Sequence, residues 1–289
     1  MRVLITGATG AVGRFITRDL LDAGYEVTLL GRARAEAAIP VGPAFLDWQL
    51  GMPVDLPPAA ALVHAALDHV PGAYRGGEGA DPEGFWRRNF DGSVQLFEAA
   101  MAQGVRRVVF LSSRAVYGGA QTVLRESDAP EPETLYGQLK HATERALAGL
   151  TRQGLSSVSL RATGVYGLCP GARGHKWQDL FATYLSGAPV APRVATEVHG
   201  RDLAAAVRLA LQRPSVTGPL NVSDLVLDRR DLLAQVRELT GCPYPLPPAA
   251  DRFRLAVMAT DRLRALGWQP GGLARLSADL PTMCDAVHA

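Results

Sequence analysis

Three glycines spaced three residues apart stand almost at the start of the chain, at Gly7, Gly10 and Gly13. They follow a short apolar run and precede residues with helical spacing, so they connect a strand to a helix. Such glycines allow a tight turn, a close approach of backbone to phosphate and close packing of helix on strand. A plain tight turn is the alternative, and the position between strand and helix favours a dinucleotide loop. The loop residues expected to contact the cofactor are Gly7, Thr9, Gly10, Ala11 and Val12.

Short apolar runs alternate with stretches of helical spacing along the first half of the chain. The runs do not alternate in polarity, which is typical of a parallel sheet covered on both faces. Two intervening helices are predicted to end at Gly24 and Gly104. The sequence therefore predicts an α/β fold, a doubly wound (Rossmann-type) parallel sheet. The predicted strands are Arg2 to Thr6, Glu26 to Leu30, Pro43 to Leu46, Ala60 to His64, Arg107 to Ser112 and Ser156 to Arg161.

Two segments rich in glycine and proline, 69–83 and 168–193, interrupt this alternation. Both follow strand ends, where ligands bind in open α/β sheets. From Asp224 onward the pattern indicates helices interrupted by the proline-rich run Cys242 to Pro248. We therefore expect two parts in the chain. A dinucleotide-binding domain spans 1–163 and is completed by 196–223, and a small C-terminal substrate-binding lobe is formed by 164–195 and 224–289.

Charge and composition limit the kinds of partner that the chain is expected to have. The formal net charge is +2 and the basic residues are spread along the sequence, which argues against a nucleic-acid partner. Cys169, Cys242 and Cys284 lie far apart and outside metal-ligand spacing, so we expect neither a disulfide framework nor a metal site. We find no run of about 18 apolar residues and no secretory pattern. A cytoplasmic protein without a membrane partner is the expectation.

Lysine is rare in this chain. Among 30 basic side chains only Lys140 and Lys176 are lysines. Genome base composition alone can produce such a bias. Alternatively, a lysine that persists among arginines marks a place where a compact ammonium group is required.

The end of the second predicted strand bears on cofactor choice. Chains that bind NAD carry an acidic residue about 20 residues beyond the glycine loop, where it hydrogen-bonds the ribose 2'-hydroxyl. Here that strand ends in Gly31 and Arg32, with Arg34 close by. Guanidinium groups without a carboxylate accommodate a 2'-phosphate, so we predict that Arg32 contacts the cofactor and that NADP is preferred over NAD. The alternative is that both arginines are solvated loop residues.

A serine, a tyrosine and a lysine follow the fifth predicted strand. Ser113 stands at the strand end, and Tyr136 and Lys140 open the next helix with a spacing that places both on one face. A free tyrosine has a pKa near 10, so acid and base chemistry at neutral pH requires a neighbouring cation such as Lys140. The pair alone is common in helices. Its position after the glycine loop and a strand-end serine predicts catalysis by Ser113, Tyr136 and Lys140.

Together these residues resemble the extended short-chain dehydrogenases, also called the NAD-dependent epimerase/dehydratase family. The resemblance covers nearly the whole chain. It implies that Ser113 rather than Ser112 supplies the catalytic hydroxyl, and that Tyr136 donates and accepts the proton. It also implies that Asp47 meets the adenine and that Ala65 and Ala66 line the cofactor. Further landmarks are Asn89, Tyr117, Gly118, Leu160, Arg161, Tyr166, Gly167, His199 and Asp202.

The resemblance also bears on substrate. In relatives that bind nucleotide sugars, the segment between the equivalents of Gly164 and Val198 is generally longer and helps to hold the nucleotide. Only 33 residues separate the two positions here, which favours a small sugar, sugar acid or other hydroxy or keto compound. We predict an NAD(P)-dependent oxidoreductase with Tyr136 as acid and base. The alternatives are a nucleotide-sugar epimerase/dehydratase with retained cofactor and a non-catalytic dinucleotide-sensing protein. A homodimer is a further expectation from the resemblance.

Several polar residues have a structural as well as a functional interpretation. His64 is either a core histidine or a group that influences the cofactor. Asn89 either ties its helix to the active site or caps it. His199 is expected at the start of a helix. Lys176, in the loop after Gly171, is either solvated or in contact with substrate.

Overall fold

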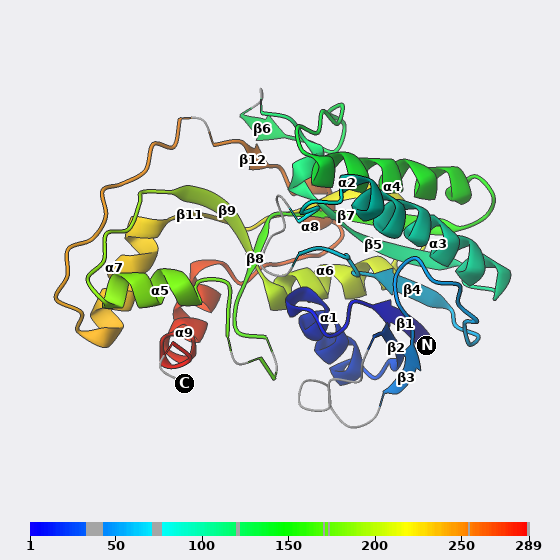
Figure 1. Ribbon diagram of the computed structural model, residues 1–289, viewed down its shortest axis with the longest axis horizontal. Coiled ribbons are helices and arrows are strands. Elements are labelled where there is room, and N and C mark those ends of the chain that lie inside the picture. Colours follow the sequence, from blue (N-terminus) through cyan, green and yellow to red (C-terminus); the bar gives the residue numbers. More distant parts are fainter. Residues whose placement is uncertain are drawn as a thin grey trace.

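A parallel seven-stranded sheet forms the centre of the molecule in the computed structural model, which describes residues 1–32, 43–70, 77–119, 122–169, 171–172, 174–253 and 255–287 (Figure 1). The strand order is β10, β7, β5, β4, β1, β2, β3. Six strands lie within one residue of the predicted runs, and this confirms the doubly wound fold. Only β10 lies outside those runs. The strands are β1 (Arg2–Thr6), β2 (Glu26–Gly31), β3 (Ala44–Asp47), β4 (Ala61–His64), β5 (Arg107–Ser113), β7 (Ser156–Ala162) and β10 (Gly218–Val222).

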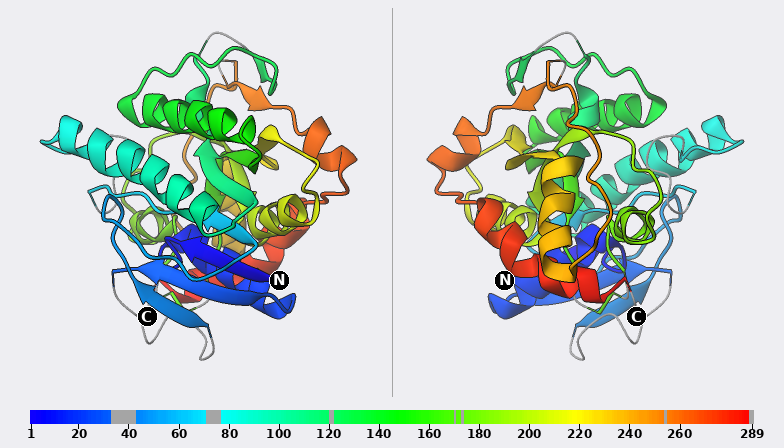
Figure 2. Two further views of the ribbon diagram at one scale, coloured as in Figure 1. Left: turned by 90° about the vertical axis from the view of Figure 1, so that its right-hand side faces the viewer. Right: turned by 90° about the vertical axis from the view of Figure 1, so that its left-hand side faces the viewer.

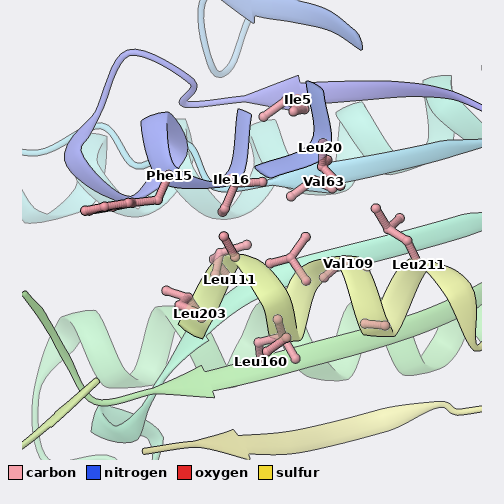
Figure 3. Packing of buried hydrophobic residues seen from close by; sticks show 14 of the residues in the cluster. Ile5, Phe15, Ile16, Leu20, Val63, Val109, Leu111, Leu160, Leu203 and Leu211 are labelled. Atoms are coloured by element: carbon pink, nitrogen blue, oxygen red, sulfur yellow. The ribbon is translucent and has the colours of Figure 1, made fainter. Parts of the chain in front are cut away.

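Helices cover both faces of this sheet (Figure 1). On one face lie α1 (Ala11–Asp22) and α6 (Gly200–Gln212), whose apolar side chains meet those of β1, β4, β5 and β7 in a single buried cluster (Figure 3). The other face carries α2 (Pro82–Trp86), a π-helical turn η1 (Arg87–Asp91), α3 (Gly92–Ala102) and α4 (Leu135–Thr151). Gly24 and Gly104 follow α1 and α3 with φ of +77° and +89°, as helix-ending glycines do.

A smaller unit lies beside the sheet, at the left of Figure 1. Its three-stranded sheet has the order β11 (Leu225–Asp228), β9 (Val194–His199), β8 (Gly164–Tyr166). Three helices, α5 (Gln178–Leu185), α7 (Arg229–Thr240) and α9 (Gly272–Asp285), pack with it around a separate apolar cluster (Figure 2, right; α7 gold, α9 red). The expectation of helices alone from Asp224 onward is wrong at β11, whose four residues complete this sheet.

The chain returns from α7 to the central sheet before it reaches α9. The two-residue strand β12 (Val257–Met258) pairs with β6 (Val123–Leu124). Along the chain, β6 follows the short 3-10 helix η2 (Arg114–Val116). The short helix α8 (Asp261–Ala265) then packs against β10. Residues late in the sequence therefore contribute to both parts of the molecule. No helix in the described part of the chain is long and apolar enough to span a membrane.

The strand order shows at which edge of the sheet a ligand is expected to bind. The chain leaves β1 toward β2 on one side, whereas β4 leads to β5 on the other, so β1 and β4 flank the switch point of the sheet. Thr6 and His64, their last residues, are register partners. Ligands of doubly wound folds bind at this crevice, beyond the carboxyl ends of the strands.

Candidate active site

The glycine loop fills the space directly above the switch point. Gly7 has φ of +72°, and a Cβ there would lie 2.7 Å from the backbone of both Ala65 and Ala66. A Cβ at Gly13 would collide with the carbonyl oxygen of Gly7, while the amide of Gly10 donates to that oxygen at 3.1 Å. The structure thus brings the predicted phosphate loop against the predicted cofactor wall after β4. Only glycine fits at Gly7, and this satisfies the tight turn with which a dinucleotide loop begins.

A directional chain of hydrogen bonds holds this crevice in place. Ser93 donates its hydroxyl to the carbonyl of Asn89, so it accepts from Nε2 of His64 at 2.9 Å. Nδ1 of His64 must then accept from the hydroxyl of Thr6 at 2.7 Å, and that hydroxyl accepts the amide of Ala66 at 3.2 Å. Burial lowers the pKa of His64 to about 3, which keeps the ring neutral. His64 is therefore a core histidine that fixes the backbone at Ala66.

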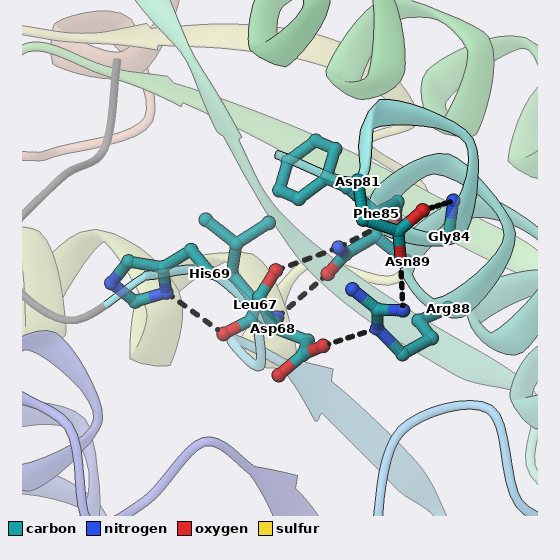
Figure 4. A network of polar contacts seen from close by, with 8 residues as sticks. All are labelled: Leu67, Asp68, His69, Asp81, Gly84, Phe85, Arg88 and Asn89. Atoms are coloured by element: carbon teal, nitrogen blue, oxygen red, sulfur yellow. Dashed lines mark hydrogen bonds and ion pairs between the residues drawn. The ribbon is translucent and has the colours of Figure 1, made fainter. Parts of the chain in front are cut away.

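Asn89 fixes the segment that follows Ala66 (Figure 4). Its side-chain amide donates to the carbonyls of Asp68 and Phe85, both at 2.8 Å, and its oxygen accepts the amide of Asp68 at 2.7 Å. Arg88 adds an ion pair of 2.6 Å to the carboxylate of Asp68. The helix cap is instead Asp81, which accepts the amide of Gly84. Of the two interpretations of Asn89, the structure supports the tie between helix and crevice.

The end of β5 and the start of α4 bring Ser113, Tyr136 and Lys140 together. Ser113 ends β5, and Tyr136 lies in the first turn of α4, where Lys140 follows one turn later. A Cβ at Gly137 would collide with the carbonyl oxygen of Ala115, so α4 begins in contact with the turn that follows Ser113. Sequence reasoning missed Gly137. Its lack of a side chain allows the close contact between the first turn of α4 and the residues after Ser113.

Lys140 lies beneath Tyr136 in a dry environment. Its Nζ is 5.7 Å from the centroid of the Tyr136 ring and 4.6 Å from that of Phe110, and it donates to the carbonyl of Leu111 at 2.7 Å. Burial lowers the pKa of Lys140 to about 8, against the opposing charge of Glu144. A cation so close to a phenol favours the phenolate. The arrangement can therefore hold a proton at the tyrosine oxygen and exchange it with a bound molecule.

The two adjacent serines of β5 face different surroundings. Ser112 points inward and donates to Glu144 at 2.5 Å, whereas Ser113 is half-buried and accepts the amide of Ala115 at 3.1 Å. Arg161 contacts both oxygens of Glu144 and donates to Tyr117 at 2.8 Å. Ser112 is thus part of a buried polar network behind the site, and the outward position belongs to Ser113.

The network continues to the outermost strand of the sheet. The hydroxyl of Tyr117 donates to Asn221 in β10 at 2.8 Å, and the amide of Asn221 donates to Leu124 and Ala259 at 3.1 and 3.0 Å. Sequence reasoning did not predict these contacts. The sequence signal for this network was the presence of charged and polar residues, such as Arg161, in otherwise apolar strands.

The residues predicted at the adenosine end lie on β2 and β3. Gly31 and Asp47 are register partners at the ends of these strands, and Asp47 is exposed. Arg32 follows directly and is exposed, whereas Arg34 lies outside the described residues. Thr9 and Ala11 are exposed at the glycine loop. These positions border one edge of the crevice.

A cavity of about 380 Å³ opens in the smaller unit. Lys176 lies in its wall and forms an ion pair with the carboxylate of Glu197. His175 turns away and contacts the carbonyl of Met283 at 2.9 Å, which ties it to α9. His199 accepts the amide of Arg201 and so begins α6, as expected. The cavity is lined by Lys176, Trp177, Asp179, Leu180, Thr183, Pro189, Val190, Ala191, Arg193, Ala195, Glu197, Leu227, Arg229 and Leu232.

The strand order, the glycine loop and the switch point define a nicotinamide-dinucleotide-dependent enzyme of the extended short-chain dehydrogenase type. The sequence model of the NAD dependent epimerase/dehydratase family matches residues 3–223. The chain belongs to this family. The predicted resemblance, fold and enzyme class are thereby confirmed.

Several known proteins are similar to the chain. UDP-glucose 4-epimerase of Streptomyces lividans is 28% identical over 99% of this chain and 94% of its own length. The dTDP-6-deoxy-L-talose 4-dehydrogenase (NAD(P)(+)) of Kitasatospora kifunensis is 33% identical over 67% of this chain and 61% of its own length. The structure of Thermus thermophilus UDP-glucose 4-epimerase in complex with NAD is 28% identical, with a TM-score of 0.80 over 100% of this chain and 99% of that chain.

Proposed function

We propose that the chain transfers a hydride between a nicotinamide dinucleotide and a hydroxyl-bearing carbon of a sugar-like or other hydroxy or keto substrate. The observation that carries this proposal is the position of Lys140 under Tyr136, next to the end of β5. This pair stands at the same edge of the sheet as the glycine loop. A phenol, a buried ammonium and a strand-end hydroxyl are the groups that such a reaction requires.

Each residue has a distinct role in the proposal. Tyr136 takes the proton of the substrate hydroxyl during oxidation and returns it during reduction. Lys140 lowers the pKa of that tyrosine through its charge. The hydroxyl of Ser113 donates a hydrogen bond to the substrate oxygen and orients it. The nicotinamide, when bound, accepts or returns the hydride.

The crevice fits a dinucleotide. Gly10 has no side chain and only one neighbouring atom near its Cβ position, so a pyrophosphate has room to approach the backbone where α1 begins. Asp47 would meet the adenine, and Arg32 would lie near the adenosine ribose. The residues proposed to hold the cofactor are Gly7, Thr9, Gly10, Ala11, Val12, Arg32, Asp47, Ala65, Ala66, Tyr136 and Lys140.

Preference for NADP over NAD stays a prediction. Gly31 at the end of β2 supports it, since this position carries no carboxylate. The similar Thermus structure was solved with NAD. The ratio of kcat/KM for the two cofactors decides between them, and a ratio at or below one for NADP would contradict the preference.

Substrate is proposed to bind between two parts of the chain. The dinucleotide-binding domain comprises 1–163 together with 196–223, and 164–195 and 224–289 supply the substrate lobe. Assembly as a homodimer and a cytoplasmic location stay predictions as well.

A second candidate is a nucleotide-sugar epimerase that retains its cofactor. The likeness to UDP-glucose 4-epimerase over 99% of the chain favours it. Net oxidation releases reduced cofactor in proportion to product, whereas epimerisation regenerates it in the site. Absorbance at 340 nm, followed together with chromatography of UDP-glucose and UDP-galactose, separates the two reactions.

The test of the proposed chemistry is Tyr136→Phe, with Tyr25→Phe at the opposite edge of the sheet as the matched control. We expect the first variant to lose turnover by a factor of about 10²–10⁴, the usual contribution of a general acid or base. The control keeps full turnover. Unchanged turnover in Tyr136→Phe would assign the proton transfer to another group, whereas dinucleotide binding without any turnover in the parent chain would favour a non-catalytic sensor.

A further inference from the structure

The first turn of α1 is fastened to the segment between β8 and α5. Arg14 lies in this turn, and its guanidinium donates from Nε to the carbonyl of Thr9 at 2.9 Å and from Nη1 to the carbonyl of Gly171 at 2.8 Å. Thr9 belongs to the glycine loop, whereas Gly171 follows Arg14 by 157 residues. One planar group therefore holds both carbonyl oxygens and brings Gly171 to the rim of the glycine loop.

Apolar contacts pack the same segment against α1. Cys169 is only 5% exposed and belongs to the buried cluster that contains side chains of α1 and α6, and Ala172 packs against this cluster. Phe15, the residue after Arg14, lies on the side of α1 that faces α6 (Figure 3). A Cβ at Gly200, the first residue of α6, would collide with the Phe15 ring. The segment is therefore docked by packing as well as by Arg14, so removal of the guanidinium is not expected to unfold it.

Aromatic rings continue this contact into the smaller unit. Phe15 forms an edge-to-face contact with His199, with ring centroids 5.5 Å apart, and His199 forms another with Tyr166 at 5.0 Å. Tyr166 in turn stacks on Trp177 at 4.8 Å, and Trp177 lies in the wall of the cavity. Close-packed interiors transmit a displacement from one group to the next. The position of α1 and the position of the smaller unit therefore depend on one another.

The charge of Arg14 stands beside the start of a helix. Both of its acceptors are neutral carbonyl groups, and no carboxylate in the described part of the chain forms an ion pair with it. None of residues 11–14, the first turn of α1, is acidic. Backbone amides at the start of a helix already favour an anion, and a half-buried guanidinium beside them adds to this preference. A pyrophosphate at this helix start would supply the missing negative charge and hold Arg14 in its bridging position.

We propose that Arg14 is a positioning residue that latches Gly171 onto the glycine loop, and that this latch slows the release of a bound dinucleotide. The inference rests on the proposed function, because it takes the crevice at the glycine loop as the dinucleotide site. It adds the residue that sets how long the dinucleotide stays bound. Slow release suits a reaction in which the hydride leaves and returns in one site, whereas net oxidation requires the dinucleotide to exchange at every turnover.

Release of the dinucleotide from the full chain tests the latch without turnover. In stopped-flow experiments, NADPH or NADH bound to the chain is displaced by excess oxidised dinucleotide and followed by fluorescence, at 1 M NaCl so that charge effects are screened beyond about 3 Å. We expect Arg14→Met to release about tenfold faster or more, a usual size for a coupling between two sites. Arg14→Lys keeps the charge without the planar fork, so its release rate should lie between those of Arg14→Met and the parent chain. Arg18→Met, which removes an exposed ion pair one turn later on α1, is the matched control and should release at the parent rate.

A second measurement follows the latch itself. Bound NADPH or NADH should slow amide hydrogen exchange in peptides of the parent chain that contain Gly171, and this protection should be lost in Arg14→Met. Release at the parent rate in either Arg14 variant at 1 M NaCl, or equal protection of these peptides in Arg14→Met and the parent chain, overturns the latch. If release and exchange behave as expected while Tyr136→Phe leaves turnover unchanged, the latch stands and the proposed proton transfer fails.

Discussion

Ser112 and Glu144 are joined by a 2.5 Å hydrogen bond behind the site, and this bond turns the hydroxyl of Ser112 away from the crevice. Adjacent residues of one strand point to opposite sides, so Ser113 takes the outward position. The two serines therefore differ in their surroundings, and we expect them to differ in role, although they are neighbours of the same type.

Alanine at each serine distinguishes these roles. Ser113→Ala removes the proposed donor to the reacting oxygen and is expected to lower kcat by about 10²–10³. Ser112→Ala takes a partner from the buried Glu144 and is expected to cost about 1–3 kcal/mol of unfolding free energy. Urea unfolding and steady-state kinetics on both variants measure the two effects. A larger loss of kcat in Ser112→Ala would reverse the assignment.

The pair of Glu144 and Arg161 is expected to contribute strongly to stability. Both side chains are less than 10% exposed, so Glu144→Gln leaves the charge of Arg161 buried without its partner. We expect a loss of about 3–5 kcal/mol in the free energy of unfolding. The exposed pair of Arg18 and Asp22 is the control, and Asp22→Asn is expected to cost no more than about 1 kcal/mol. Equal costs for the two variants would show that burial of the pair does not matter.

Activity is expected to depend on the charge of Lys140. The pKa of its ammonium is lowered from 10.5 to about 8 by burial, so the group loses its proton as the pH rises through 8. The profile of kcat/KM for the free enzyme should then fall above pH 8. Lys140→Arg keeps the charge to far higher pH, so its falling limb should disappear, at a lower absolute rate. A falling limb that stays near pH 8 in Lys140→Arg would assign it to another group.

The ionisation of Lys140 also makes the free energy of unfolding depend on pH. Between about pH 8 and 10.5 the unfolded chain binds more protons at Lys140 than the folded chain does. The free energy of unfolding should therefore rise with pH over this window, and the full cost of burying the cation is present below pH 8. Lys140→Met should lack this rise. Unfolding in urea at pH 7.5 and 9.5 gives the comparison.

Gly7 and Gly24 share a positive φ and differ in their surroundings. A Cβ at Gly7 meets the backbone of Ala65 and Ala66, whereas a Cβ at Gly24 meets nothing within 4 Å. Gly24→Ala should therefore cost about 1–2 kcal/mol of backbone strain and leave dinucleotide affinity unchanged. Gly7→Ala should cause the same strain and should also displace the backbone of Ala65 and Ala66, which forms the wall of the crevice. We therefore expect it to weaken NADP and NAD binding at least tenfold. Fluorescence titration with the reduced cofactors measures this, and equal affinities in the two variants would exclude a role of Gly7 in binding.

The central sheet was predictable because its strands are buried on both faces. In the run Arg107 to Ser112, for example, residues 108–111 are continuously apolar, and a short run of this kind is typical of a strand in a covered parallel sheet. The sheet of β8, β9 and β11 was not predicted, since β9 carries Thr196 and Glu197 among its apolar residues. A two-residue strand such as β12 has no sequence signal of its own, because its pairing depends on β6 far earlier in the chain.

The candidate site was predictable only where its residues are close in sequence. Tyr136 and Lys140 are four residues apart on one helix, and the strand-end Ser113 precedes them. The network behind them joins α4, β7 and β10 through Glu144, Arg161 and Asn221. Spacing along the chain cannot indicate such contacts. They arise from tertiary packing of distant elements.

The late position of β10 in the chain has a consequence for synthesis on the ribosome. A nascent chain that ends after α6 already contains six strands of the central sheet, but the outer edge of β7 has no neighbour until residues 218–222 have emerged. An unpaired edge of a strand that is buried in the finished fold is a site where chains pair with one another. Translation pauses or truncations before residue 218 are therefore expected to yield aggregated chains. Release of the sheet as a self-sufficient N-terminal fragment is not expected.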